Sequence, residues 1–132
     1  MVTLIALISS GKGTWGQVLS VINSYKWDNI YLICNNFSYD NFKIDPNLAI
    51  KLKFDEKNLI KSFNKISDFF KKNIKDFEVA INLYSGNGME HMILVSSILK
   101  SGLGIRFVYC ENKELKEFKL LELDEIEEYV EF

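Results

Sequence analysis

Several residue types that support stapled or metal-bound small folds are scarce in this chain. It contains two Cys, one His and one Pro among 132 residues. Two cysteines fit a reducing compartment better than a disulfide scaffold. The single histidine, His91, has no Cys or acidic residue at the spacing of a metal site. We therefore expect no metal site and no cofactor.

Long apolar runs and a strong excess of one charge are also missing. No apolar stretch has the length of a transmembrane helix, and the N-terminus lacks the basic leader of a signal peptide. The net charge of -2 gives no general attraction to nucleic acid or to anionic membranes. We therefore expect a cytoplasmic protein that has neither a membrane nor double-stranded nucleic acid as a partner. Any anion site should be local.

The length suits one domain, which we expect to span residues 1–132, with 124–132 as an acidic tail that is either a short helix or frayed. Apolar runs predict buried strands, and the alternating stretch 48–54 is typical of a strand near a sheet edge. The turn 112–113 predicts a C-terminal hairpin. The predicted strands are 2–8, 29–35, 48–54, 77–84, 105–111 and 114–123.

Three helices are predicted between these strands, over 14–26, 56–75 and 89–101. The second has an apolar stripe opposite its lysines, which is typical of a surface helix that covers a core. The third is apolar on nearly all sides, so we expect it to be well buried. The apolar stripe of the second helix consists of Leu59, Phe63, Ile66, Phe70 and Ile74.

This alternation of strands and helices predicts an α/β fold. We expect a Rossmann-like three-layer sandwich, with a mainly parallel sheet, helices on both faces and a C-terminal β-hairpin. Ligands bind such sheets beyond the carboxyl ends of the strands, where the strand order reverses. If strands 2–8 and 77–84 are central neighbours, the loops that follow them meet at that point.

The loop after the first strand contains Gly11, Gly13 and Gly16 in the pattern G-x-G-x-x-G. A dinucleotide site also needs an acidic residue about twenty positions later, and this chain has Asn35 and Asn36 there. The loop is not a P-loop either. It still offers glycines, hydroxyl groups and one cation at a helix N-terminus, which suits an anion, although a plain strand-to-helix turn is the alternative. Its candidate ligand-binding residues are Ser9, Ser10, Gly11, Lys12, Gly13 and Thr14.

A second glycine-containing loop follows the strand 77–84 and precedes the helix 89–101. Two such loops side by side would direct two helix N-termini into one crevice, so together they predict a polar, phosphate-bearing ligand. Tyr84 is a candidate for stacking on a base, and His91 lies on the first helical turn at the rim. The candidate residues here are Asn82, Tyr84, Ser85, Gly86, Asn87, Gly88 and His91.

Residues 79–118 resemble the CARF (CRISPR-associated Rossmann fold) domain family. Asn82 near a strand end, then Ser85, Gly86 and Gly88 in the loop and Met92 in the helix, fit the family outline. Many members carry a Lys or Arg just after the second glycine, where this chain has Met89–His91. As a standalone member, the chain is expected to form a homodimer that binds a cyclic oligoadenylate across the two-fold axis. The resemblance implies contacts from Ser10, Lys12, Thr14, Asn82, Ser85, Gly86, Asn87 and Gly88.

Three alternatives remain open at this point. The same site could cleave the ring as a metal-independent ring nuclease, with Lys12 stabilising the transition state and Ser85 orienting the ligand. The chain could instead bind a dinucleotide. It could also be a non-catalytic scaffolding protein in which the glycine loops are only turns.

Overall fold

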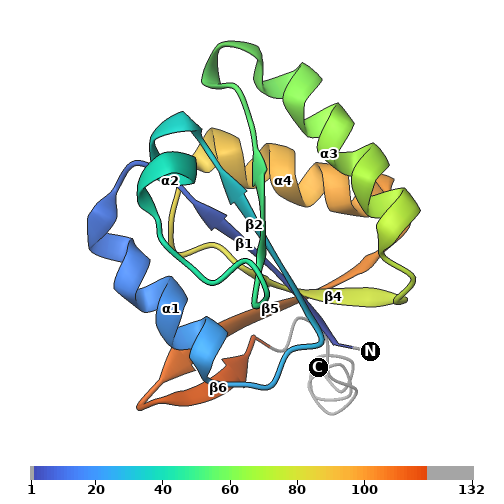
Figure 1. Cartoon of the computed structure of the whole chain (residues 1–132). Helices are drawn as coiled ribbons and strands as arrows, with labels where there is room; N and C mark the ends of the chain where they lie inside the picture. Colours follow the sequence, from blue (N-terminus) through green and yellow to red (C-terminus); the bar gives the residue numbers. More distant parts are fainter. Residues whose placement is uncertain (1, 119–132) are drawn as a thin grey trace, which may run out of the picture.

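The computed structural model describes residues 2–118 and contains one six-stranded sheet in the order β3-β2-β1-β4-β5-β6 (Figure 1). All neighbouring strands are parallel except β5 and β6, which are antiparallel. The predicted parallel sheet with a C-terminal hairpin is therefore confirmed, and β1 and β4 are neighbours at its centre. The strands are β1 (Thr3–Ile8), β2 (Asn29–Cys34), β3 (Ile50–Lys53), β4 (Glu78–Asn82), β5 (Gly104–Glu111) and β6 (Glu114–Glu117).

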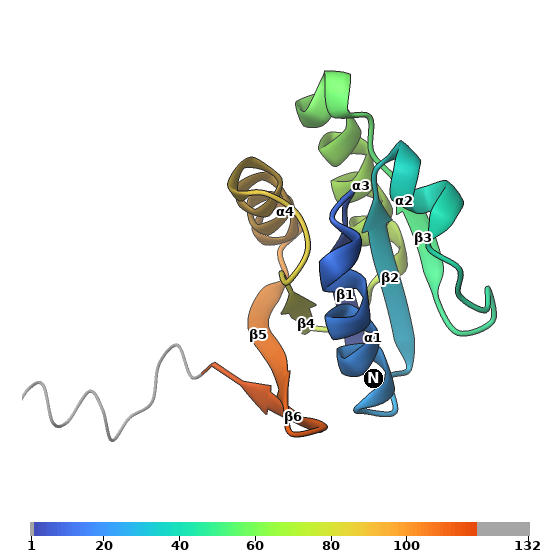
Figure 2. The ribbon, with the colours of Figure 1, turned by 90° about the vertical axis from the view of Figure 1, so that its left-hand side faces the viewer.

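Helices cover both faces of this sheet, as the Rossmann-like prediction requires. Helices α3 and α4 lie together on one face, and α1 lies on the other (Figures 1 and 2). A short 3-10 helix precedes both α1 and α3. The helical elements are η1 (Lys12–Thr14), α1 (Trp15–Asn23), α2 (Asn36–Asn41), η2 (Glu56–Asn58), α3 (Leu59–Asn73) and α4 (Gly88–Lys100).

The apolar core is divided by the sheet into two clusters. The alternation of side chains along β1 sends Ile5 and Leu7 to the α3–α4 face, and Leu4 and Ala6 to the α1 face. All six residues of β1 are buried, as expected of a central parallel strand. The predicted stripe of α3 is confirmed, since Phe63, Ile66, Phe70 and Ile74 belong to the first cluster, with Leu59 packed against it.

The C-terminal hairpin turns at Asn112 and Lys113, as predicted. Both residues have positive φ, 52° and 65°, which is the backbone of the two-residue turn that matches strand twist. Arg106 in β5 joins Glu117 in β6 through Nη2 and Oε1, at 2.7 Å. The end of the predicted strand 114–123 and the tail 124–132 lie outside the described residues.

Two features differ from the sequence prediction. Helix α2 was not predicted, because its polar sequence has no apolar stripe. Helix α4 is not well buried: Met89, Met92 and Leu99 are 54%, 61% and 56% exposed. Only one side of α4 contacts the sheet, through Leu94 and its neighbours. Its apolar outer side therefore lacks a partner within the described residues.

The two cysteines lie on β2 and β5, three positions apart in the sheet, and both are free thiols. Burial raises the pKa of Cys34 to about 11. No helix in residues 2–118 combines the length and the apolar character needed to cross a membrane.

The raised pKa of Cys34 predicts an alkaline loss of stability. Between about pH 9 and pH 11 the unfolded thiol ionises and the folded thiol stays neutral, so the folded state loses about 1.4 kcal/mol per pH unit. Urea unfolding at several pH values should show this decline. A Cys34→Ala variant, less stable at neutral pH, should decline less steeply, whereas an identical decline in both proteins would contradict the prediction.

Candidate functional site

The two glycine-containing loops meet at the carboxyl ends of β1 and β4. The strands pair in register, with Ala6 opposite Asn82. Just beyond this point, the Ser9 backbone N–H donates a hydrogen bond to Ser85 Oγ at 2.8 Å. The sheet order reverses between these two strands, which is where open α/β sheets bind ligands. The predicted neighbourhood of the two loops is therefore present.

The first loop leads into η1 and α1 without a side-chain cap. In the described part of the chain, no side chain accepts a hydrogen bond at the start of either element. Thr14 Oγ1 instead donates back to the Gly11 carbonyl at 2.9 Å. The Thr14 and Trp15 N–H groups bond to the Gly11 and Lys12 carbonyls, so the groups that this start offers to solvent or an anion are the earlier ones, at Lys12 and Gly13.

Neither backbone conformation nor close packing in the described chain requires glycine at the three glycine positions of the first loop. Gly11, Gly13 and Gly16 all have ordinary negative φ, and a Cβ built on any of them has no neighbouring atom within 4 Å. A side chain would therefore fit at all three positions. The glycines leave free space in front of the backbone, as a loop that admits a ligand requires.

Gly86 in the second loop has a different role. Its φ is +99°, and a Cβ at this position would overlap the side chain of Leu7. Only glycine allows the loop to turn so close to β1. Gly88 has open space around it and begins α4.

A capping box closes the start of α4. Asn87 Oδ1 accepts the Glu90 N–H at 2.9 Å, and Glu90 Oε1 accepts the Asn87 N–H at 3.0 Å. Glu90 is buried, so its carboxylate takes the place that an anionic ligand would need at this helix end. The two helix starts therefore differ, and only that of the first loop is open to an anion.

The remaining predicted residues of the second loop hold the loop itself. Ser85 is buried, and its carbonyl lies 2.8 Å from His91 Nε2. Asn82 Nδ2 donates to the Val108 carbonyl, and its Oδ1 accepts the Tyr84 N–H. Tyr84 Oη accepts the Cys110 N–H at 3.1 Å. Asn82 and Tyr84 thus tie β4 to β5 and leave little of either side chain for a ligand.

Asn35 belongs to the site but was not among the candidates. It is buried at the end of β2, where its Nδ2 donates to Ser10 Oγ at 2.7 Å and lies 3.4 Å from Ser9 Oγ. Its Oδ1 accepts the Ser38 N–H and so caps α2. An asparagine after a buried strand is a common N-cap, and this signal could have located α2. Asn35 links the first loop to α2.

Lys12 rests on an aromatic pair rather than over the loop. Its Nζ lies 5.9 Å from the centre of the Trp15 ring and 5.3 Å from that of Phe37. Trp15 is fixed by its Nε1–H, which donates to the Ser9 carbonyl at 2.8 Å. The exposed lysine is therefore held at the edge of the first loop by cation–π contacts.

Other classes of site find less support in residues 2–118. These residues contain no group of three or more His, Cys, Asp or Glu side chains placed to hold a metal ion. A search of protein-family models and of curated proteins gives no match to this chain.

Proposed function

We propose that this protein binds a phosphate-bearing nucleotide at the first loop, with a cyclic oligoadenylate as the ligand that the likeness to CARF domains favours. The observation that carries the proposal is the first loop itself: an uncapped helix start, three glycines in open space and an adjacent lysine. Backbone N–H groups would bind the phosphate, and Lys12 would add charge.

The second loop supports this site mainly by position. Ser85 Oγ receives the Ser9 N–H and fixes where the first loop begins. Because Ser85 is buried and already bonded, a positioning role suits it better than contact with the ligand. Within the described residues, no observation specifically favours ring cleavage over binding alone.

A homodimer would complete this site, and we include it in the proposal. A single chain offers an open surface at the first loop, and α4 begins beside it with an unpartnered apolar outer side. Pairing two copies through Met92, Leu99 and their neighbours would bury this side. It would also bring a second copy of the loops near the first.

Replacing Lys12 with Ala tests the phosphate site. We expect binding of a cyclic oligoadenylate to weaken by about tenfold, because a charge-assisted contact is lost. Isothermal titration with a panel of ring sizes would measure the affinity. Lys75→Ala is the matched control, since Lys75 is exposed and lies just after α3. Equal affinity of Lys12→Ala and wild type would remove Lys12 from the site.

Incubating the same cyclic ligands with the protein separates binding from cleavage. We expect the cyclic ligand to be recovered intact after long incubation with the purified protein. Linear products that increase with protein concentration would instead favour the ring nuclease. If no member of the panel binds, the scaffolding alternative gains support.

A further inference from the structure

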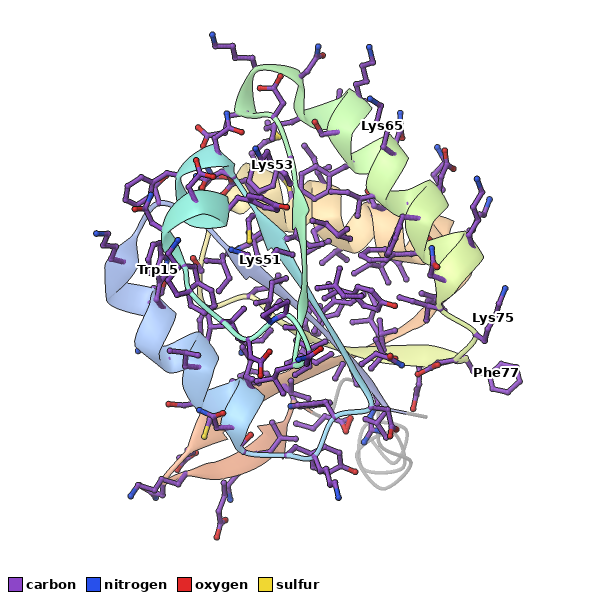
Figure 3. The ribbon with its side chains drawn as sticks, viewed as in Figure 1. Trp15, Lys51, Lys53, Lys65, Lys75 and Phe77 are labelled. Carbon is purple, nitrogen blue, oxygen red and sulfur yellow. The ribbon has the colours of Figure 1, made fainter. Side chains whose placement is uncertain are left out.

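Aromatic and basic side chains gather next to the first loop, on and around α2. The lysine–aromatic cluster consists of Lys12, Trp15 and Phe37, with Tyr39, Lys51 and Lys53 beside it. Trp15, Lys51 and Lys53 are labelled in Figure 3, all on the side of the molecule where α2 lies. Neither the phosphate site nor the fold described so far explains why Phe37 is 41% exposed.

The Trp15 ring of this cluster is held in a fixed position and lies beside Phe37. The Trp15 and Phe37 ring centres are 6.0 Å apart with their planes at 39°. The buried Phe42 meets Trp15 edge-on, with ring centres 5.5 Å apart. With its indole N–H bonded to Ser9, the Trp15 side chain has little freedom. A ring surface fixed before binding loses little entropy when a flat ligand stacks on it.

Lys51 holds α2 in the orientation that presents Phe37. Its Nζ donates to the Tyr39 carbonyl at 2.6 Å and to the Phe42 carbonyl at 3.0 Å, at the C-terminal end of α2. A cation at this end of a helix is stabilising. Asn35 caps the other end of α2 and bonds to Ser10 in the first loop. The aromatic surface and the phosphate site therefore belong to one connected unit.

We infer that Phe37 and Trp15 form a stacking surface for the base of the nucleotide whose phosphate the first loop binds. This inference rests on the proposed function and specifies it. A base would replace the Lys12 ammonium over the two rings, and Lys12 would turn toward the phosphate. Base-on-aromatic stacking tolerates any base, so the surface selects for a nucleobase and not for its identity.

The test compares two probes that differ only by the base, adenosine 5′-monophosphate and ribose 5-phosphate. A Trp27→Phe background leaves Trp15 as the only tryptophan, so its fluorescence reports on the surface. We expect the adenylate to quench Trp15 and to bind about tenfold more tightly than the sugar phosphate. Phe37→Leu should remove this preference, because it keeps an apolar side chain but no ring.

Phe77→Leu is the matched control, since Phe77 is 96% exposed and precedes β4, at the opposite end of the sheet from the first loop (Figure 3). It should leave both affinities unchanged, whereas Lys12→Ala should weaken both probes. Equal affinities for the two probes in wild type, with no effect of Phe37→Leu, would overturn the stacking surface and leave the phosphate site standing. Failure of both probes and of every cyclic oligoadenylate to bind would overturn the proposed function and the inference together.

Discussion

Replacing Gly86 with Ala is expected to lower the free energy of unfolding by about 3 kcal/mol. The left-handed backbone at φ +99° costs a non-glycine residue roughly 1–2 kcal/mol. The added methyl group would also overlap Leu7, which is fully buried in β1, and overpacking of this kind costs roughly 1–3 kcal/mol. The change should therefore displace the second loop from the first as well as destabilise the fold.

Urea unfolding followed by circular dichroism would measure this effect, with Gly13→Ala as the matched control. Gly13 has negative φ and open space around its Cβ position, so its free energy of unfolding should change by less than about 1 kcal/mol. The same Gly13→Ala protein should bind the nucleotide ligand more weakly, since the methyl group occupies space left for it. Similar stability of the two variants would contradict the close approach of Gly86 to Leu7.

Replacing Leu99 with Glu is expected to abolish the proposed homodimer. Leu99 lies on the outer side of α4 and is 56% exposed in the single chain. Two like charges facing each other across a two-fold interface would be buried without a partner, which costs several kcal/mol. The variant should therefore elute as a monomer in size-exclusion chromatography with light scattering, whereas wild type is expected to elute at twice the chain mass.

Leu48→Glu provides the control for this experiment. Leu48 is similarly exposed, at 48%, but it precedes the edge strand β3, away from the face that α4 covers. Its acidic variant should remain dimeric. A monomeric wild-type protein at all concentrations, or a dimer that survives Leu99→Glu, would remove α4 from the assembly. In the first case the site would have to act as an open surface of one chain.

The fold was largely predictable because its signals are local. The apolar run of β1 and the apolar stripe of α3 each appear within a short window, and both formed the expected element. Asn112 and Lys113 likewise occupy the positive-φ turn that their position between two strands predicts. The adjacency of the two glycine loops then follows from the connection rules of parallel sheets.

The details of the site were less predictable because they depend on distant partners. Tyr84 had the properties of a stacking residue, but its hydroxyl group pairs with Cys110, which is 26 positions away. The stacking candidate that the structure offers, Phe37, lies in α2, a short helix without an apolar stripe. The inward position of Glu90 was not predicted either, although Asn87 three residues earlier forms the pattern of a capping box with it.

The sheet order has a last consequence for how the chain comes to fold during synthesis. Ser9 and Ser85 are 76 positions apart, so one edge of β1 has no partner until β4 has left the ribosome. Contacts of such separation form slowly, and β1 is entirely apolar apart from Thr3. The nascent chain therefore carries an apolar strand with one unpaired edge until β4 has been synthesised, and such edges are prone to aggregation.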